Sequence, residues 1–441
     1  MSTTLNAVQT RHELLERLSD ARVRTDQLFD IIRPESLYDR PIPERHRIIF
    51  YIGHLEAFDW NLLSGRLLDL KPFNPELDKL FAFGIDPVGG GLPTDQPADW
   101  PKVQDVRNYV RAARETLDRE LEGVLSTPGS YEFSPSLLLN VAIEHRLMHA
   151  ETLAYMFHQL PHDRKVRQPQ AAVSETGLTT PAMIEIPAGK VTLGLRREDS
   201  TFGWDNEYEA HEVAVSGFAI DKYMVTNREF LGFVSAGGYE ERSLWAEADW
   251  EWRTGQNISH PVFWTRSGDR WYWRGMFEDV CLPLDWPVYV SHAEATAYAR
   301  WAGKALPTEA QWHRAAYGTP NDVERDYPWD ESAPRPQLGN FNFQRWDPAP
   351  VGGWPDAESA FGVAGLLGNG WEWTSSKFEP FGGFTPFPFY RGYSADFFDG
   401  KHYVMKGGSP RTAACMLRRS FRNWFQSHYQ YVYAGFRCVS N

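Results

Sequence analysis

The N-terminal part of the chain carries apolar side chains at helical spacing. The stretch RHELLERLSDARVRTDQLFDII repeats them every three or four positions, as an amphipathic helix does. Residues 45–70, 101–125 and 134–159 continue the pattern, and the last begins near Ser134 or Pro135, residue types that favour a helix start. Four long helices predict a four-helix bundle, a fold whose core often holds metal sites.

Two segments of different amino-acid composition interrupt this helical pattern. Residues 72–100 are rich in Gly and Pro and are long for a connection within a bundle, and long loops are often functional. Residues 160–180 are polar and aperiodic, which is typical of a linker. The predicted organisation is a helical bundle over residues 1–165, a linker over 166–180 and a second domain over 181–441.

The second domain mixes short strand and helix signals. PAMIEIPAGKVTLG predicts a short hairpin, and FAIDKYMVTNREFLGFV predicts a strand followed by a helix. Capping boxes, in which a Ser or Thr precedes a Glu or Gln by three positions, mark three helix starts: Thr226–Glu229, Ser291–Glu294 and Thr308–Gln311. The rest is rich in Gly and aromatic residues. We therefore expect an irregular α+β domain.

Composition narrows the class of protein. The net charge is −13 and the pI about 5.5, which argues against nucleic acid and anionic membranes as partners. The sequence has no apolar run of about 18 residues, and MSTTLNAVQTRHELLERL lacks the apolar segment of a secretory signal. Three scattered cysteines, Cys281, Cys415 and Cys438, make no disulfide framework. These features predict a cytoplasmic protein.

The chemistry most visible in the bundle is a pair of histidines. His145 and His149 lie four residues apart in EHRLMHAETLAYM, so a helix places both on one face. His54 lies in another helical stretch, FYIGHLEAFDWNLL, and would complete a three-histidine site if the two helices pack together. Glu144 and Glu151 flank the pair and would accept hydrogen bonds from the rings. The alternative is that these are surface or satisfied core histidines, and spacing alone does not decide between the two.

Six ordered motifs make the second domain resemble the formylglycine-generating-enzyme-like (sulfatase-modifying-factor) fold, a C-type-lectin-like architecture. They are MIEIPAGKVTLG, DKYMVTNREF, LPTEAQWHRAA, GNGWEWTSS, KGGS and AGFRC. The bundle resembles the DinB-like fold. The combination, with three bundle histidines, resembles the ergothioneine-synthase EgtB family of non-haem iron enzymes, which includes selenoneine synthases, and the resemblance covers nearly the whole chain.

The resemblance implies a mononuclear iron(II) held by His54, His145 and His149. Such enzymes use O2 to join a donor to the imidazole of hercynine, the Nα-trimethylated form of histidine, and the sulfur enzymes form a sulfoxide. Three histidine ligands leave open positions on the metal, which is a catalytic arrangement. Imidazole suits both iron and zinc, so the resemblance alone favours iron. The expected partners are small molecules: hercynine and a thiol or selenol donor.

The resemblance also suggests substrate and catalytic residues. A trimethylammonium group favours aromatic faces. The family's Asn–Trp pair that helps to bind hercynine maps onto Asn423 and Trp424, followed here by Phe425. Tyr390 and Tyr393 lie where the family often has a catalytic tyrosine, and the register between the two stays open. The alternative for each aromatic residue is a packing role.

Departures from the family pattern bear on the donor. Members that take γ-glutamylcysteine have an acidic residue after the Asn–Trp pair, where this chain has Phe425, and arginines in the loop that here reads GIDPVGGGLPTDQ. Some members have Gln just before the last metal histidine, where this chain has Met148. A donor with two carboxylates would lack partners here. We therefore expect cysteine as the donor, with a selenosugar, as in selenoneine synthases, as the alternative.

Two other functions compete with this interpretation. A formylglycine-generating oxidase would need a close cysteine pair to bind copper, whereas only Cys415 follows KGGS closely, and we expect it to be a packed thiol. A non-catalytic binding module would not need three bundle histidines. Relatives of the second domain bind calcium, which makes Asn369 and Glu372 candidate Ca(II) ligands. Alternatively, Glu372 is a structural acceptor.

Overall fold

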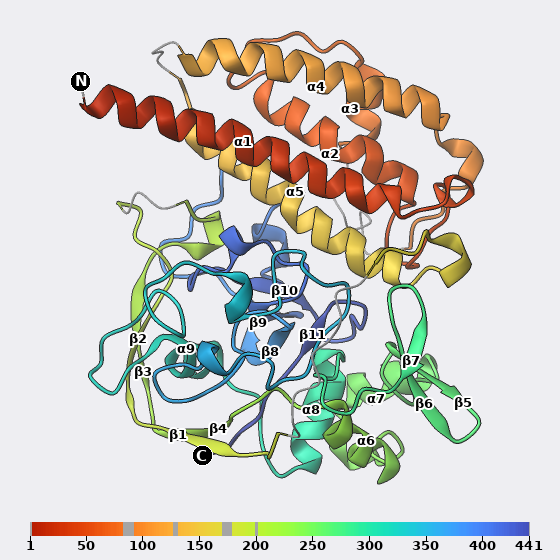
Figure 1. Ribbon diagram of the computed structural model, residues 1–441, viewed down its shortest axis with the longest axis vertical. Coiled ribbons are helices and arrows are strands. Elements are labelled where there is room, and N and C mark those ends of the chain that lie inside the picture. The colour runs from red at the N-terminus through yellow and green to blue at the C-terminus, as the bar shows by residue number, and fades with distance from the viewer. Residues whose placement is uncertain (1, 83–91, 127–130, 170–178, 199–201, 441) are drawn as a thin grey trace. The chain divides into compact units, whose positions relative to one another are not determined.

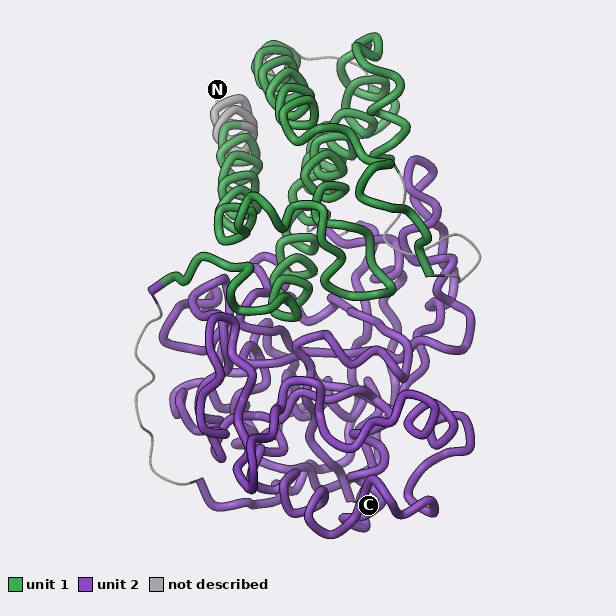
Figure 2. The backbone as a smooth tube through the Cα atoms, turned by 90° about the vertical axis from the view of Figure 1, so that its right-hand side faces the viewer, with its two compact units in different colours: residues 1–168 green, residues 169–441 purple. Residues whose placement is uncertain are grey.

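The structure is a computed structural model that describes residues 2–82, 92–126, 131–169, 179–198 and 202–440. The chain divides into two compact units, residues 1–168 and 169–441 (Figure 2). The first unit is helical, and the second combines short helices with short strands. The predicted fold class, a helical bundle followed by an irregular α+β domain, is confirmed.

In the described part of the first unit, the α-helices are four long ones and one short one, which are labelled in Figure 1. Their bounds are α1 (Ser2–Asp30), α2 (Ile48–Leu63), α3 (Pro75–Leu80), α4 (Val103–Ser126) and α5 (Pro135–His158). Helix α1 packs along α5, and α2 packs against α3, α4 and α5. Helix α2 thus lies against three other helices of this unit, including α5.

Two details of the bundle differ from the expected pattern. The helix expected over 45–70 ends at Leu63, because Gly65 lowers helix propensity just beyond that point. The Gly- and Pro-rich segment 72–100 contains helix α3, which begins at Pro75 with its backbone capped by the Asn74 side chain.

Helix α5 is buried over nearly its whole length. Every residue from Leu138 to His158 except Met148 is buried. Polar side chains that a buried helix carries need partners, because an unpaired buried polar group costs free energy. The buried polar side chains of His145, Arg146 and His149 are therefore expected to have partners within this unit.

The described residues of the second unit form four small sheets and four α-helices. The four-stranded sheet has the order β10-β9-β8-β11, with antiparallel pairs except for the parallel pair β11–β8. Its strands are β8 (Gly370–Lys377), β9 (His402–Gly408), β10 (Asn423–Gln426) and β11 (Ala434–Gly435). Strand β10 therefore lies at an edge of this sheet.

The other sheets are smaller. Their orders are β1-β4-β12, β2-β3 and β5-β6-β7. Their strands are β1 (Met183–Ile186), β2 (Gly189–Leu193), β3 (His211–Val215), β4 (Phe218–Asp221), β5 (Trp264–Ser267), β6 (Arg270–Arg274), β7 (Asp279–Cys281) and β12 (Val439–Ser440). The helices are α6 (Asn227–Ser235), α7 (Glu247–Gly255), α8 (His292–Trp301) and α9 (Glu309–Tyr317).

The predicted helix starts are confirmed and the predicted hairpin is wrong. Helices α6, α8 and α9 each begin with the expected capping box. Strands β1 and β2 do not pair with each other: β1 pairs with β4, and β2 pairs with β3. The two residues between them are Pro187 and Ala188, and neither suits the positive φ angles that a tight hairpin turn requires.

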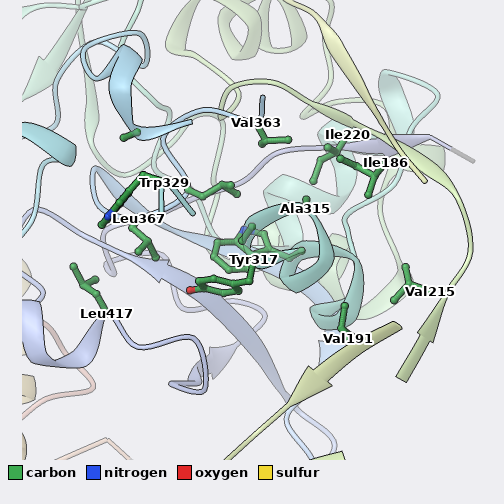
Figure 3. Close-up of a cluster of buried hydrophobic side chains, with 14 of the residues drawn as sticks. Ile186, Val191, Val215, Ile220, Ala315, Tyr317, Trp329, Val363, Leu367 and Leu417 are labelled. Atoms are coloured by element: carbon green, nitrogen blue, oxygen red, sulfur yellow. The ribbon is translucent and has the colours of Figure 1, made fainter. Parts of the chain in front are cut away.

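A cluster of buried side chains holds the second unit together (Figure 3). It joins Ile186 and Val191 of the small sheets to Ala315 and Tyr317 of α9 and to Leu367 in the segment before β8. Within the part of the chain that the structure describes, no helix is long and apolar enough to cross a membrane.

Candidate metal centre

Two packed helices bring three histidines together in the first unit. His54 lies on α2, and His145 and His149 lie one turn apart on α5, all three of them buried. One ring nitrogen of each histidine lies within 4.8 Å of a ring nitrogen of the other two. Among the described residues, these three histidines are the group whose side chains could hold a metal ion together. The sequence predicted that the three histidines meet only if their two helices pack together, and the structure shows this packing.

The ring geometry fits a shared ion better than hydrogen bonding between the rings. His149 Nε2 lies 3.2 Å from His54 Nε2 and 3.2 Å from His145 Nε2. A single proton on His149 makes one good hydrogen bond, so it cannot satisfy both contacts. Two imidazoles bound to one metal at about 2.1 Å, with an angle between about 90° and 109°, place their nitrogens about 3.0–3.4 Å apart. The observed spacing falls in that interval.

The backbone fixes which nitrogen of His54 faces the centre. His54 Nδ1 lies 2.7 Å from the carbonyl oxygen of Phe81, the residue that follows α3. A carbonyl only accepts, so Nδ1 carries the proton and donates, and Nε2 keeps its lone pair for a ligand. Such a partner is typical of metal-binding histidines. Glu144 and Glu151 are buried on α5, and their expected role toward the rings stays a prediction.

Burial keeps the rings neutral. It lowers the pKa of His54 from its usual 6.5 to about 4, against the opposing effect of the Phe81 carbonyl. Burial also lowers the pKa of His145 and of His149 well below the usual value. Neutral imidazole is the form that binds a metal, so the site needs no proton release near pH 7.

Aromatic rings surround the three imidazoles. Phe58 stacks on His145 with ring centroids 3.4 Å apart, and Phe50 stacks on His54 at 4.9 Å. These contacts restrict the ring orientations and make the surroundings apolar. The donor set is therefore three neutral imidazole nitrogens, which suits a divalent transition metal and not calcium or magnesium.

In the second unit, three of the expected substrate and catalytic residues lie in one aromatic cluster. The Trp424 ring stacks on Phe378 at 4.1 Å and meets Tyr393 edge-on at 5.4 Å. Tyr390 lies 5.6 Å from Tyr393, and Tyr393 stacks on Trp204 at 3.9 Å. The structure thus brings Trp424, Tyr390 and Tyr393 together.

Asn423 and Phe425 lie on the other face of strand β10. Successive side chains of a strand point to opposite faces. Accordingly, Phe425 stacks on Tyr429 at 4.9 Å, away from the Trp424 cluster. The Asn423 side-chain oxygen accepts from the backbone N–H of Trp424 at 2.9 Å.

A buried acidic residue that the sequence pattern did not single out holds the segment that carries Tyr390 and Tyr393. The buried Asp205 carboxylate accepts from Ser394 Oγ at 2.6 Å and from the Phe387 backbone N–H at 3.4 Å. Burial and this carboxylate together raise the pKa of Tyr390. The sequence shows only a run of three polar residues after Trp204, Asp-Asn-Glu, and nothing in it indicates that all three are buried.

The calcium expectation at Asn369 and Glu372 finds no support in the geometry. Glu372 forms a fully buried ion pair with Arg437 at 2.7 Å and also accepts from the Trp312 ring N–H at 2.8 Å. The Asn369 amide is bonded to the Ala349 backbone in both directions at 2.8 Å. The structural alternative stated for Glu372 is therefore the one observed.

The expectation for Cys415 is wrong. Cys415 is exposed rather than buried, and Cys281 is exposed as well, whereas Cys438 is buried. The segment that carries Cys415 is the short 3-10 helix Ala414–Met416, whose buried member is Met416. In this short helix, Met416 and not Cys415 packs into the core.

Each of the two units matches a known protein family. Residues 168–441 match the sulfatase-modifying factor enzyme 1-like domain, and residues 17–153 match the DinB superfamily. The chain is 33% identical over 441 residues to hercynine oxygenase of Mycolicibacterium thermoresistibile, covering 98% of this chain and 95% of the relative. It is 32% identical to hercynine oxygenase of Mycolicibacterium smegmatis, covering 97% and 98%.

A fungal relative extends the comparison. Ergothioneine biosynthesis protein 1 of Neurospora crassa is 28% identical, covering 92% of this chain and 55% of the longer fungal protein. The chain belongs to the hercynine oxygenase family, in which a DinB-type bundle precedes a sulfatase-modifying-factor-type domain. It is therefore an oxygen-dependent oxidoreductase, as the sequence predicted.

Proposed function

We propose that the chain is an iron(II)- and O2-dependent enzyme that joins a sulfur donor to C2 of the imidazole of hercynine. The observation that carries the proposal is the buried grouping of His54, His145 and His149 in a chain whose full-length relatives are named hercynine oxygenases. The histidines alone suit iron or zinc. The oxygenase names of the relatives favour iron, because zinc has no redox chemistry.

The residues of the centre would prepare a metal for this reaction. Bound iron(II) would supply the electrons and the open coordination positions that O2 chemistry requires. The three neutral imidazoles take up only part of the coordination sphere. The Phe81 carbonyl keeps His54 in the tautomer that binds through Nε2. The rings of Phe50 and Phe58 limit access of water to the ligands.

The aromatic cluster of the second unit is our proposed site for the trimethylammonium group. Trp424 and Tyr393 meet nearly at right angles, with an interplanar angle of 79°. Such a corner offers aromatic surface to a cation that cannot donate hydrogen bonds. Asn423 and Phe425 face the other side of β10, so we assign them to a different part of the substrates. The proposed catalytic tyrosine is one of the pair Tyr390 and Tyr393.

The donor is proposed to be cysteine and not γ-glutamylcysteine. Phe425 stands where an acid would pair with the longer donor. Two arginines contact the segment that follows the Gly-rich loop, but Arg40 and Arg47 both form ion pairs with Asp95, and the Arg47 pair spans 2.9 Å. They are therefore committed within the protein. Residues 83–91, which include most of the loop, lie outside the described residues.

A selenosugar is the second candidate donor. Phe425 and Tyr429 stack at 4.9 Å and Tyr431 lies edge-on to Tyr429 at 5.5 Å, so this side of β10 carries aromatic rings and no acid in its strand. Aromatic faces suit an uncharged sugar. The bond formed would then join carbon to selenium.

A comparison of donors tests the proposal. Anaerobic protein loaded with Fe(II) and hercynine is given cysteine, γ-glutamylcysteine or a selenosugar, then O2, and the products are identified by mass. We expect a cysteine adduct, and a kcat/KM for γ-glutamylcysteine lower by about a hundredfold, because an unpaired buried carboxylate costs several kcal/mol. Efficient use of γ-glutamylcysteine contradicts the donor assignment, and no adduct with any donor contradicts the function.

A further inference from the structure

A buried arginine links the two helices that carry the three histidines. Arg146 follows His145 on α5, and its side chain is 0% exposed. Its Nη2 donates to the carbonyl oxygen of Leu55 at 2.9 Å. Leu55 follows His54 on α2. One side chain thus connects positions that are each directly next to a histidine of the centre.

Two carboxylates of α2 complete the linkage. Arg146 Nη2 also donates to Asp59 Oδ2 at 2.6 Å, and Arg146 Nη1 lies 3.0 Å from Glu56 Oε1. Glu56 in turn accepts from Arg114 of α4 at 2.7 Å, and Arg114 pairs with Asp26 of α1. The guanidinium therefore contacts α2 at three successive points, Leu55, Glu56 and Asp59, while the network continues to the other two long helices.

Stability alone is a poor reason for this arrangement. The Arg146–Asp59 pair is 0% exposed on both sides. Removing two charges from water costs about as much as their attraction returns, so an apolar pair of similar volume is often as stable or more stable. What the fork of an arginine adds is geometry, because it fixes the distance and the orientation between the two partners.

We propose that Arg146 is a positioning residue for the three-histidine centre: it sets the separation and rotation of α2 relative to α5. The inference deepens the proposed function and rests on it. Two ligands come from α5 and one from α2, and a metal centre tolerates errors of only about 0.5 Å in ligand placement. The Phe81 carbonyl orients the His54 ring, but it does not tie α2 to α5.

The test measures metal affinity in variants that keep the fold. In Arg146→Lys the charge remains and the fork is lost. The double variant Arg146→Met, Asp59→Leu replaces the pair by apolar side chains, and Glu56 keeps its partner Arg114. Co(II) and Fe(II) affinities are measured by chelator competition, Co(II) coordination by its visible absorption spectrum, and folding by urea denaturation.

We expect the affinity of both variants for Co(II) and Fe(II) to fall by about tenfold to a hundredfold, as is typical when a residue that supports the ligands is changed. The Co(II) spectrum should change, while the double variant unfolds at a urea concentration near that of wild type. The matched control is Arg22→Met, Asp118→Leu, which removes an Arg–Asp pair between α1 and α4, helices without a ligand, and should leave affinity and spectrum unchanged.

The outcomes separate the two claims. If the wild-type protein binds neither metal through its histidines, the proposed function fails. If wild type binds metal and the folded double variant binds it equally well with the same spectrum, the positioning role of Arg146 is wrong. Asp59→Asn keeps the shape of the side chain, so it provides the same comparison if an Arg146 variant does not fold; unchanged affinity and spectrum there also overturn the role.

Discussion

A single methyl group added at Gly53 should weaken metal binding without touching a histidine. Gly53 lies on α2 directly before His54. A Cβ at this position would lie 2.5 Å from Cδ2 and 2.5 Å from Cε2 of the Phe81 ring, well inside contact distance. The Phe81 carbonyl oxygen is the partner of His54 Nδ1. Gly53→Ala therefore pushes on the residue that orients this ligand.

The magnitude follows from two opposing effects. Ala is about 1 kcal/mol better than Gly in a helix. The Phe81 ring is fully buried, with Trp100 and Tyr109 at centroid distances of 6.4 and 6.0 Å, so it cannot simply swing aside. Overpacking of this kind costs about 1–3 kcal/mol. We expect a net loss of up to about 2 kcal/mol in unfolding free energy, and a tenfold or greater loss of metal affinity.

The assay compares Gly53→Ala with Gly123→Ala. Gly123 is an exposed residue of α4 and a Cβ there meets no atom within 4 Å, so this control should gain up to about 1 kcal/mol of stability with unchanged affinity. Urea denaturation of the metal-free protein gives stability, and chelator competition gives Fe(II) affinity. Wild-type affinity in Gly53→Ala would refute the role of the Phe81 carbonyl.

Three further predictions concern pH, substrate and calcium. The metal-free protein should lose stability as pH falls below about 6.5, because the imidazoles bind protons in the unfolded chain but not when buried in the folded protein, where the pKa of His54 is about 4 and those of His145 and His149 are also lowered. Each histidine contributes up to about 1.4 kcal/mol per pH unit to the free energy of unfolding. A variant with all three histidines changed to Gln should show a weaker dependence of this free energy on pH in urea denaturation, and an unchanged dependence would refute the prediction. Trp424→Ala should raise the KM for hercynine about tenfold at unchanged iron content, and an unchanged KM in steady-state kinetics argues against the assignment. Glu372→Gln should lower the free energy of unfolding by about 3–5 kcal/mol, because it leaves the buried charge of Arg437 unpaired. A rise in the melting temperature of the wild-type protein on addition of calcium would contradict the structural role of Glu372.

Local patterns predicted the elements of this protein well. Helical periodicity located the four long helices, and the three capping boxes marked real helix starts, because both signals depend on residues a few positions apart. The hairpin prediction for residues 181–194 failed for a non-local reason. The partners of β1 and β2 are β4 and β3, which lie farther along the chain, and pairing between distant strands leaves no local pattern.

The candidate site was predictable only in part. The spacing of His145 and His149 followed from helix geometry, whereas the contribution of His54 depended on how α2 packs against α5. The Phe81 carbonyl could not be predicted, because every residue has a carbonyl and only the fold selects one. Arg146 was missed for a related reason: its partners Leu55 and Asp59 are 91 and 87 residues away in the sequence.

The most direct test of the central claim is a single-turnover measurement of hercynine consumption per iron. Anaerobic protein loaded with Fe(II) is mixed with hercynine and cysteine and exposed to O2, with His54→Ala supplied with the same iron in parallel. We expect that wild type converts hercynine to a C2 adduct in proportion to bound iron, and that His54→Ala holds little iron and forms little product. Equal product from His54→Ala, or intact hercynine beside fully loaded wild-type protein, contradicts it.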